Sequence, residues 1–196
     1  MKVGTRDRIL GAALDVFAGK GYHRAIVDDI VRASGTSKGA VYHHFPNKEA
    51  VFIALVDDFA ERLAVAVAAA VGARHGALSK VEGALTAALT TFADDERLAR
   101  LILLEAVSLG AAYQAKRAEV AGRFAALIQG YLDEAAGDGS IAALDTRIAT
   151  LAWLGAVNEV VTQWLHGAVG DLRATIPALT GILLRSIGAR ASAERG

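Results

Sequence analysis

Helical periodicity extends along almost the whole of this 196-residue chain. Apolar residues recur at spacings of three and four, Ala, Leu and Val dominate, and only two prolines interrupt the pattern. No alternating run of β-branched residues between turn signals predicts a strand. We therefore expect an all-α protein of about nine helices.

Glycines and capping residues divide this pattern into segments. Thr5, Ser37 and Asn47 are expected N-caps, and Gly35 is expected to end the second helix in the left-handed conformation. We expect the long helix after Asn47 to join an N-terminal three-helix head, residues 1–48, to a helical body, residues 49–196. The expected helices cover 5–18, 27–34, 37–45, 47–71, 79–93, 95–110, 114–136, 144–166 and 172–190.

Composition and charge exclude several classes of protein. The chain has no cysteine, which excludes disulfides, thiolate metal sites and cysteine nucleophiles. We expect no signal peptide and no transmembrane helix, and hence a cytoplasmic protein.

Net charge is zero, but residues 1–50 hold eight Lys/Arg against five Asp/Glu, and the remainder holds thirteen against sixteen. A mildly basic head on a mildly acidic body is compatible with a DNA-contacting module.

Residues 26–45 carry the most specific pattern. They predict two short helices separated by a tight turn at Gly35, which is the spacing of a helix-turn-helix. Ile30, Val41 and Phe45 are the expected apolar anchors that fix the crossing of the two helices. An ordinary helical hairpin with a solvated face is the alternative interpretation.

The other face of the second helix is polar. Lys38 and Tyr42 are four residues apart and share a face, and the serine, lysine, tyrosine and histidine side chains there can donate to phosphates or contact base edges. A metal site at His43 and His44 is disfavoured, because adjacent helical residues point about 100° apart and make a poor chelate. This composition favours DNA contact.

The head resembles the DNA-binding region of the tetracycline-repressor (TetR) family of bacterial regulators over residues 5–52, about a quarter of the chain. The resemblance implies that the recognition helix enters the major groove, with Lys48 holding a phosphate at the next helix N-terminus. It implies DNA contacts at Thr36, Ser37, Lys38, Gly39, Tyr42, His43 and His44. The matching pattern is Ile9, Ala12-Ala13, Phe17, Gly21-Tyr22, Val27-Asp28-Asp29-Ile30, Ala33 to Gly39, Val41-Tyr42 and Phe45-Pro46-Asn47-Lys48-Glu49.

One departure from the family pattern lies just before the motif. Family members often place Thr or Ser there as cap and phosphate contact, whereas this chain has Ala25 and Ile26. Either the contact is lost or Arg24 replaces it with a charge. Asp28 and Asp29 are expected to complement the positive end of the helix that they begin.

For the body, the resemblance implies a helical core that binds a ligand and forms a homodimer. Two apolar stripes on the last two helices favour pairing into a four-helix bundle. The alternative is that these helices are internal core. The stripes comprise Leu172, Ile176, Leu179, Leu183 and Ile187 on the final helix, and Leu151, Ala152, Gly155, Ala156 and Trp164 on the helix before it.

A ligand site is predicted less specifically. Asn158, Thr162 and His166 share one stripe, whose partners would be a ligand, the second subunit or other side chains. The aromatic candidates are expected either to line an apolar cavity or to be ordinary core residues. For Glu105, the alternative to ligand binding is an ion pair with an arginine. The candidate ligand residues are Phe59, Phe92, Glu105, Tyr113, Trp153, Asn158 and Thr162. The apolar composition favours a hydrophobic or amphipathic effector.

Catalytic signatures are missing from the sequence. It contains no Gly-rich phosphate loop, no His-Glu-x-x-His, no Gly-x-Ser-x-Gly and no dinucleotide fingerprint. We expect no enzyme, no cofactor, no metal and no membrane partner. The leading hypothesis is a homodimeric, ligand-responsive repressor of a palindromic operator on double-stranded DNA. The alternatives are a constitutive DNA-binding repressor without a ligand, and a helical enzyme or carrier.

Overall fold

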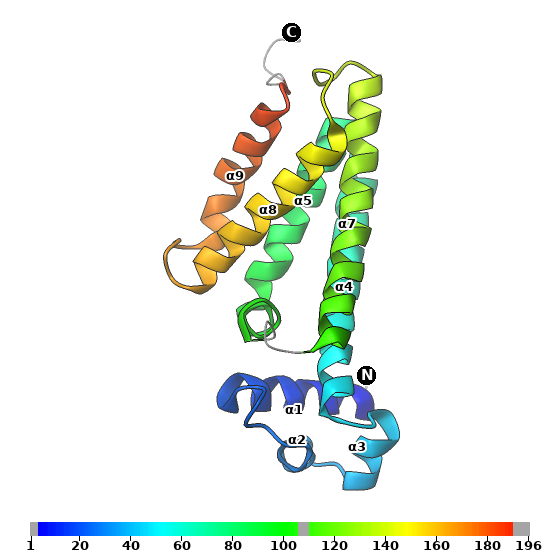
Figure 1. Cartoon of the computed structure of the whole chain (residues 1–196), viewed down its shortest axis with the longest axis vertical. Helices are drawn as coiled ribbons and strands as arrows, with labels where there is room; N and C mark the ends of the chain where they lie inside the picture. The colour runs from blue at the N-terminus through cyan, green and yellow to red at the C-terminus, as the bar shows by residue number, and fades with distance from the viewer. Residues whose placement is uncertain (1–3, 106–109, 190–196) are drawn as a thin grey trace. The chain divides into compact units, whose positions relative to one another are not determined.

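The computed structural model describes residues 4–105 and 110–189, and within these ranges it contains nine α-helices, one π-helical turn and no strand (Figure 1). The all-α prediction is therefore confirmed. In the same ranges, no helix is both long and apolar enough to cross a membrane. The helices are α1 (Thr5–Lys20), α2 (Val27–Ser34), α3 (Lys38–His44), α4 (Lys48–Gly72), α5 (Ala77–Asp94), α6 (Glu96–Arg100), α7 (Ala111–Gly137), α8 (Thr146–Leu165) and α9 (Leu172–Ser186).

The chain forms two compact units. One comprises Met1–Glu61 and Asp95–Arg117, and the other comprises Arg62–Asp94 and Ala118–Gly196. The long helices α4 and α7 each contribute residues to both units. The first unit thus extends past the predicted functional boundary after residue 48, and that boundary stays a prediction.

An aromatic cluster organises the first unit. The ring centroid of Phe17 on α1 lies 5.4 Å from that of Tyr22 and 6.0 Å from that of Phe52 on α4. Phe17 and Phe52 are fully buried, and Ile9 is buried with them. Burying such side chains stabilises the unit by about 1.5–3 kcal/mol each. The cluster fixes α1, the following loop and the start of α4 against one another.

Local capping follows the sequence at two of the three expected N-caps and at Gly35. The Ser37 hydroxyl accepts from the Ala40 amide at 3.1 Å, and the Asn47 side chain accepts from the Ala50 amide at 2.8 Å, so both expected N-caps are confirmed. Gly35 has a φ of 61°, the expected left-handed conformation. The prediction for Thr5 is wrong, because Gly4 is the N-cap and Thr5 is already the first helical residue.

The predicted helix over 95–110 is not continuous. The α-helical part ends with α6, and a π-helical turn covers Leu101–Glu105. The Tyr113 hydroxyl donates to the Ile102 carbonyl oxygen within that turn at 2.5 Å. A side chain that reaches a helix carbonyl in this way is a common cause of departure from regular α-helical bonding. Residues 106–109 lie outside the described part of the chain.

In the second unit, α9 packs along α5 and α8. This packing corrects one expectation, because the apolar stripe of α9 assigned to a dimer interface is core of the single chain. The physical reason is that α5 and α8 cover this stripe within the single chain, which leaves the opposite face of α9 outside. The buried residues of the stripe are Leu172, Ile176, Leu179, Leu183 and Ile187.

Candidate nucleic-acid interface

Helix α3 has one buried face and one exposed face. Val41 and, just after the helix, Phe45 are buried, as is Ile30 of α2, so the three expected anchors hold the helix as predicted. The predicted contact residues of the other face are exposed except for half-buried Thr36, whose hydroxyl lies 2.7 Å from that of Ser34. The exposed residues are Ser37, Lys38, Gly39, Tyr42, His43 and His44. Their contact with DNA stays a prediction.

Lys38, the first residue of α3, is joined to α2. Its Nζ lies 2.8 Å from Asp28 Oδ1 and 6.0 Å from the ring centroid of Tyr42. The hydrogen bond and charge of the Asp28 carboxylate raise the pKa of Lys38. Lys38 therefore stays charged while an acceptor from the neighbouring helix holds its ammonium group.

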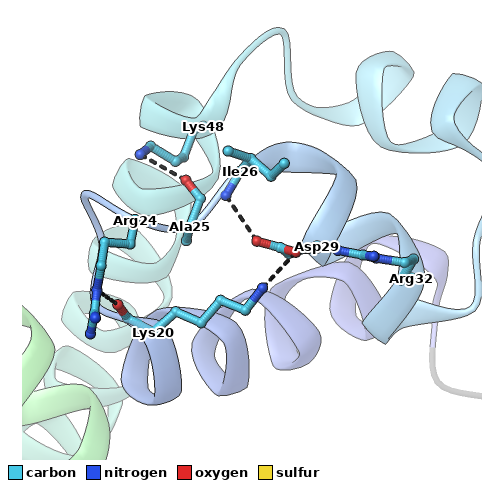
Figure 2. Close-up of polar contacts among 7 residues, drawn as sticks. All are labelled: Lys20, Arg24, Ala25, Ile26, Asp29, Arg32 and Lys48. Carbon is cyan, nitrogen blue, oxygen red and sulfur yellow. Dashed lines mark hydrogen bonds and ion pairs between the residues drawn. The ribbon is translucent and has the colours of Figure 1, made fainter.

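The second acidic residue of α2 has different surroundings. Asp29 is buried and accepts from Lys20 Nζ at 2.7 Å, from the Ile26 amide at 3.2 Å and from the Arg32 guanidinium (Figure 2). The bond from Lys20, then those from Ile26 and Arg32, hold the pKa of Asp29 at about 2. The amide bond fits the expected role at a helix N-terminus. The sequence analysis missed the two ion pairs.

Lys48 has partners that the resemblance does not predict. Its Nζ donates to the carbonyl oxygens of Tyr22 at 2.8 Å and His23 at 3.3 Å. It also donates to that of Ala25 at 3.0 Å (Figure 2). It also lies 4.3 Å from the Tyr22 ring centroid, and burial lowers the pKa of Lys48. An ammonium group has three donors, and here all three are used. In this geometry Lys48 ties the loop after α1 to the start of α4, and its phosphate contact stays a prediction.

The loop after α1 carries the departure from the family pattern. Ile26 is exposed at the N-cap of α2 and makes no side-chain cap. Arg24 is exposed, and its Nε donates to the Lys20 carbonyl oxygen at 2.8 Å (Figure 2). An open depression lies in the same loop, lined by Lys20, Gly21, Tyr22, His23 and Arg24. Arg24 is thus exposed but bonded back to the end of α1, and its replacement of the family's phosphate contact stays a prediction.

The predicted ligand residues are distributed over both units. Phe59 and Tyr113 are buried in the first unit. In the second unit, Trp153 is buried and donates from Nε1 to the Ser186 hydroxyl at 3.2 Å. Among the other predicted ligand residues of the second unit, Phe92 and Thr162 are half-buried and Asn158 is exposed. The side chain of Glu105 lies outside the described part of the structure. The polar stripe of Asn158 therefore faces outward on α8, and its ligand role stays a prediction.

No metal-binding geometry occurs in the described ranges. Among those residues, no group of three or more His, Asp or Glu side chains is placed to hold a metal ion. The rings of His43 and His44 lie 5.3 Å apart between centroids, in an edge-to-face arrangement.

Two family models match the chain. The model described as bacterial regulatory proteins of the tetR family matches residues 9–55. The model described as a tetracyclin repressor-like C-terminal domain matches residues 74–168. The first covers the helix-turn-helix described above, and the second covers most of the second unit together with α6 and the start of α7.

Full-length relatives are also similar to the chain. The fatty acid metabolism regulator protein of Bacillus subtilis (strain 168) is 26% identical over 178 residues, which is 90% of each chain. The structure of the fatty acid degradation regulator FadR from Bacillus halodurans is 30% identical, with a TM-score of 0.82, over 91% of this chain and 97% of that one. The structure of FadR from Bacillus subtilis in complex with stearoyl-CoA is 25% identical, with a TM-score of 0.79, over 94% and 98%.

Proposed function

The chain belongs to the TetR family of bacterial regulatory proteins, and from that premise we propose that it is a homodimeric repressor released from a palindromic operator by a fatty acyl-CoA. As a member of that family it is a DNA-binding transcriptional regulator. The observation that carries the proposal is the exposed polar face of α3, held outward by buried Val41 and Phe45. Two such helices would enter successive major grooves, about one helical turn apart.

An exposed apolar face on the last two helices supports the homodimer. Ile148 and Leu151 of α8 and Ile182 of α9 are each more than half exposed. The small residues Ala152 and Gly155 lie on the same exposed face of α8 and permit close approach of a second helix. Exposed apolar side chains on neighbouring helices favour an interaction site, and a two-fold axis would let the same face cover itself. In our proposal, α8 and α9 of two protomers form a four-helix bundle.

The effector proposal rests on the relatives. One similar protein is a fatty acid metabolism regulator, and another was solved with stearoyl-CoA, in both cases with 90% or more of each chain covered. An acyl chain is apolar, as the predicted hydrophobic or amphipathic effector requires, and it would be buried among helices. By linkage, the acyl-CoA must bind the DNA-free form better than the DNA-bound form. Helix α4 contributes to both units and is the proposed lever.

In this proposal the protein acts in the cytoplasm and binds the acyl-CoA without turning it over. Recovery of intact acyl-CoA after prolonged incubation with the protein is the expected result. Appearance of free CoA would instead favour the enzyme alternative.

Selection of genomic fragments by the purified protein at near-physiological salt tests the operator. We expect one or a few palindromes. If folded, ligand-free protein enriches no sequence, the proposal is contradicted.

The recovered operator then serves for titration with acyl-CoAs of graded chain length, free CoA and free fatty acid. Long-chain acyl-CoA should weaken operator binding by roughly 5- to 150-fold, whereas free CoA and fatty acid should have little effect. Operator binding unchanged by every compound would favour a constitutive repressor.

A further inference from the structure

A donor and an acceptor lie side by side on the exposed surface of the helix-turn-helix. Lys38 Nζ on α3 is 2.8 Å from Asp28 Oδ1 on α2, and the two side chains are 60% and 54% exposed. The neighbouring Asp29 is turned inward to Lys20 and Arg32. Of the two acidic residues in the first turn of α2, Asp28 is therefore the one that presents its carboxylate beside the recognition helix.

The order of these groups matches one base pair in the major groove. A G·C pair presents two guanine acceptors, N7 and O6, next to the N4 donor of cytosine. Lys38 supplies donors, and Asp28 supplies an acceptor directly beside them. A T·A pair also presents an acceptor next to a donor, but it has the thymine methyl group where guanine has N7. A lysine whose donors reach both guanine acceptors would distinguish a G·C pair from a T·A pair.

The carboxylate also disfavours the simplest alternative partner of Lys38. A lysine alone on a DNA-facing surface binds phosphates, which carry no sequence information directly. Asp28 repels a phosphate at the same place and holds the ammonium group of Lys38. The pair is therefore better suited to a base edge than to the DNA backbone.

We propose that Asp28 and Lys38 form one reading unit for a G·C base pair in each operator half-site, with Asp28 as a specificity-determining residue. Lys38 donates to guanine O6 and N7, and Asp28 accepts from cytosine N4. This inference rests on the proposed sequence-specific binding to an operator.

Selection from randomised DNA duplexes with the full-length protein tests the unit. The variants are Asp28→Ala, Lys38→Ala and the double variant. Asp15→Ala is the matched control, because Asp15 on α1 forms an equally short, exposed pair with Arg97, at 2.8 Å. It removes the same charge and the same kind of ion pair away from α2 and α3.

The unchanged protein should select G·C at one position of each half-site. Asp28→Ala should reduce that preference by roughly 5- to 150-fold and increase affinity for random DNA. Lys38→Ala should also remove the preference, and the double variant should resemble Lys38→Ala, because the two residues act together. Asp15→Ala should keep the preference of the unchanged protein.

Two outcomes would overturn the inference while leaving operator binding intact. One is an unchanged preference in Asp28→Ala, and the other is an equal loss in Asp15→Ala, which would make net charge the cause. Circular dichroism checks folding, and if Asp28→Ala does not fold, Asp28→Asn, which keeps an acceptor oxygen, should retain part of the preference. If the unchanged protein selects no sequence, the operator proposal itself fails, and this inference fails with it.

Discussion

Lys38 and Lys48 are each the first residue of a helix, yet their ammonium groups have different partners. Lys38 meets one exposed carboxylate and lies 6.0 Å from the Tyr42 ring centroid. Lys48 instead meets three backbone carbonyl oxygens and lies 4.3 Å from the Tyr22 ring centroid. Both lysines were assigned to DNA from their positions in the motif. Their surroundings give Lys48 a structural role in the head, whereas the DNA contacts of both lysines stay predictions.

Lys48→Met should therefore lower the free energy of unfolding. The variant loses charge-assisted bonds to the loop carbonyls, which we expect to cost about 1–3 kcal/mol in urea denaturation. Lys38→Met is the matched control and should stay within about 0.5 kcal/mol of the unchanged protein, because exposed ion pairs contribute little. Equal stability of the Lys48 variant would mean that its ammonium group is available for phosphate.

Asp29 should make the stability of the head sensitive to acid. Its pKa is about 2 in the folded chain against an ordinary value of 3.8, so its ion pairs stabilise the fold above pH 4. That stabilisation should be lost as pH falls from about 4 towards 2, because the unfolded chain takes up the proton first. The Tm difference between the unchanged protein and Asp29→Asn should shrink over this window. A constant difference down to pH 2 would contradict the assignment.

At the scale of the element, α3 is seven residues long and depends on its neighbours for its position. An isolated helix of this length is unstable in water. The Ser37 cap, the turn at Gly35 and the buried side chain of Val41 supply the missing support. Its exposed face therefore takes no part in holding the helix and is available for the proposed DNA contacts.

Gly39→Ala tests whether the backbone of α3 approaches DNA closely, without disturbing the fold. An added Cβ would meet only the Ser37 hydroxyl at 3.9 Å, so the fold should be kept and stability should rise by at most about 1 kcal/mol. Affinity for the operator should fall, because the backbone of α3 could no longer approach the DNA as closely. The control is Gly11→Ala in α1, where the added Cβ has nothing within 4 Å and operator affinity should not change. Equal affinity of both variants would argue against close approach at Gly39.

At the scale of the whole molecule, the last two helices show which apolar surface remains for a partner. The stripe of α9 that includes Leu179 and Leu183 is covered within the single chain. Leu151 and Ile182 instead remain exposed on α8 and α9. The proposed dimer would therefore use a face of α9 that the sequence analysis did not select, while Leu151 of α8 was selected correctly as an exposed apolar residue.

If the proposed dimer forms through α8 and α9, Leu151→Glu should convert it to a folded monomer. A charge at the centre of the proposed bundle would be buried without a partner, which costs several kcal/mol. Val65→Glu is the control, because it makes the same change at an exposed apolar position on α4 and should leave the dimer intact. Size-exclusion chromatography with light scattering measures both. A dimeric Leu151 variant would place the interface elsewhere.

Spacing and local chemistry in the sequence determined the helical class, most helix limits, two of the three expected caps and the polar face of α3. These features depend on residues within one or two turns of one another, as the Ser37 cap and the left-handed Gly35 show. The tertiary structure alone decided the carbonyl partners of Lys48, more than 20 residues away, and the inward turn of Asp29 to Lys20. It also decided which stripe of α9 is core. Such outcomes depend on which surfaces meet when helices pack, and periodicity along one helix does not specify its neighbour.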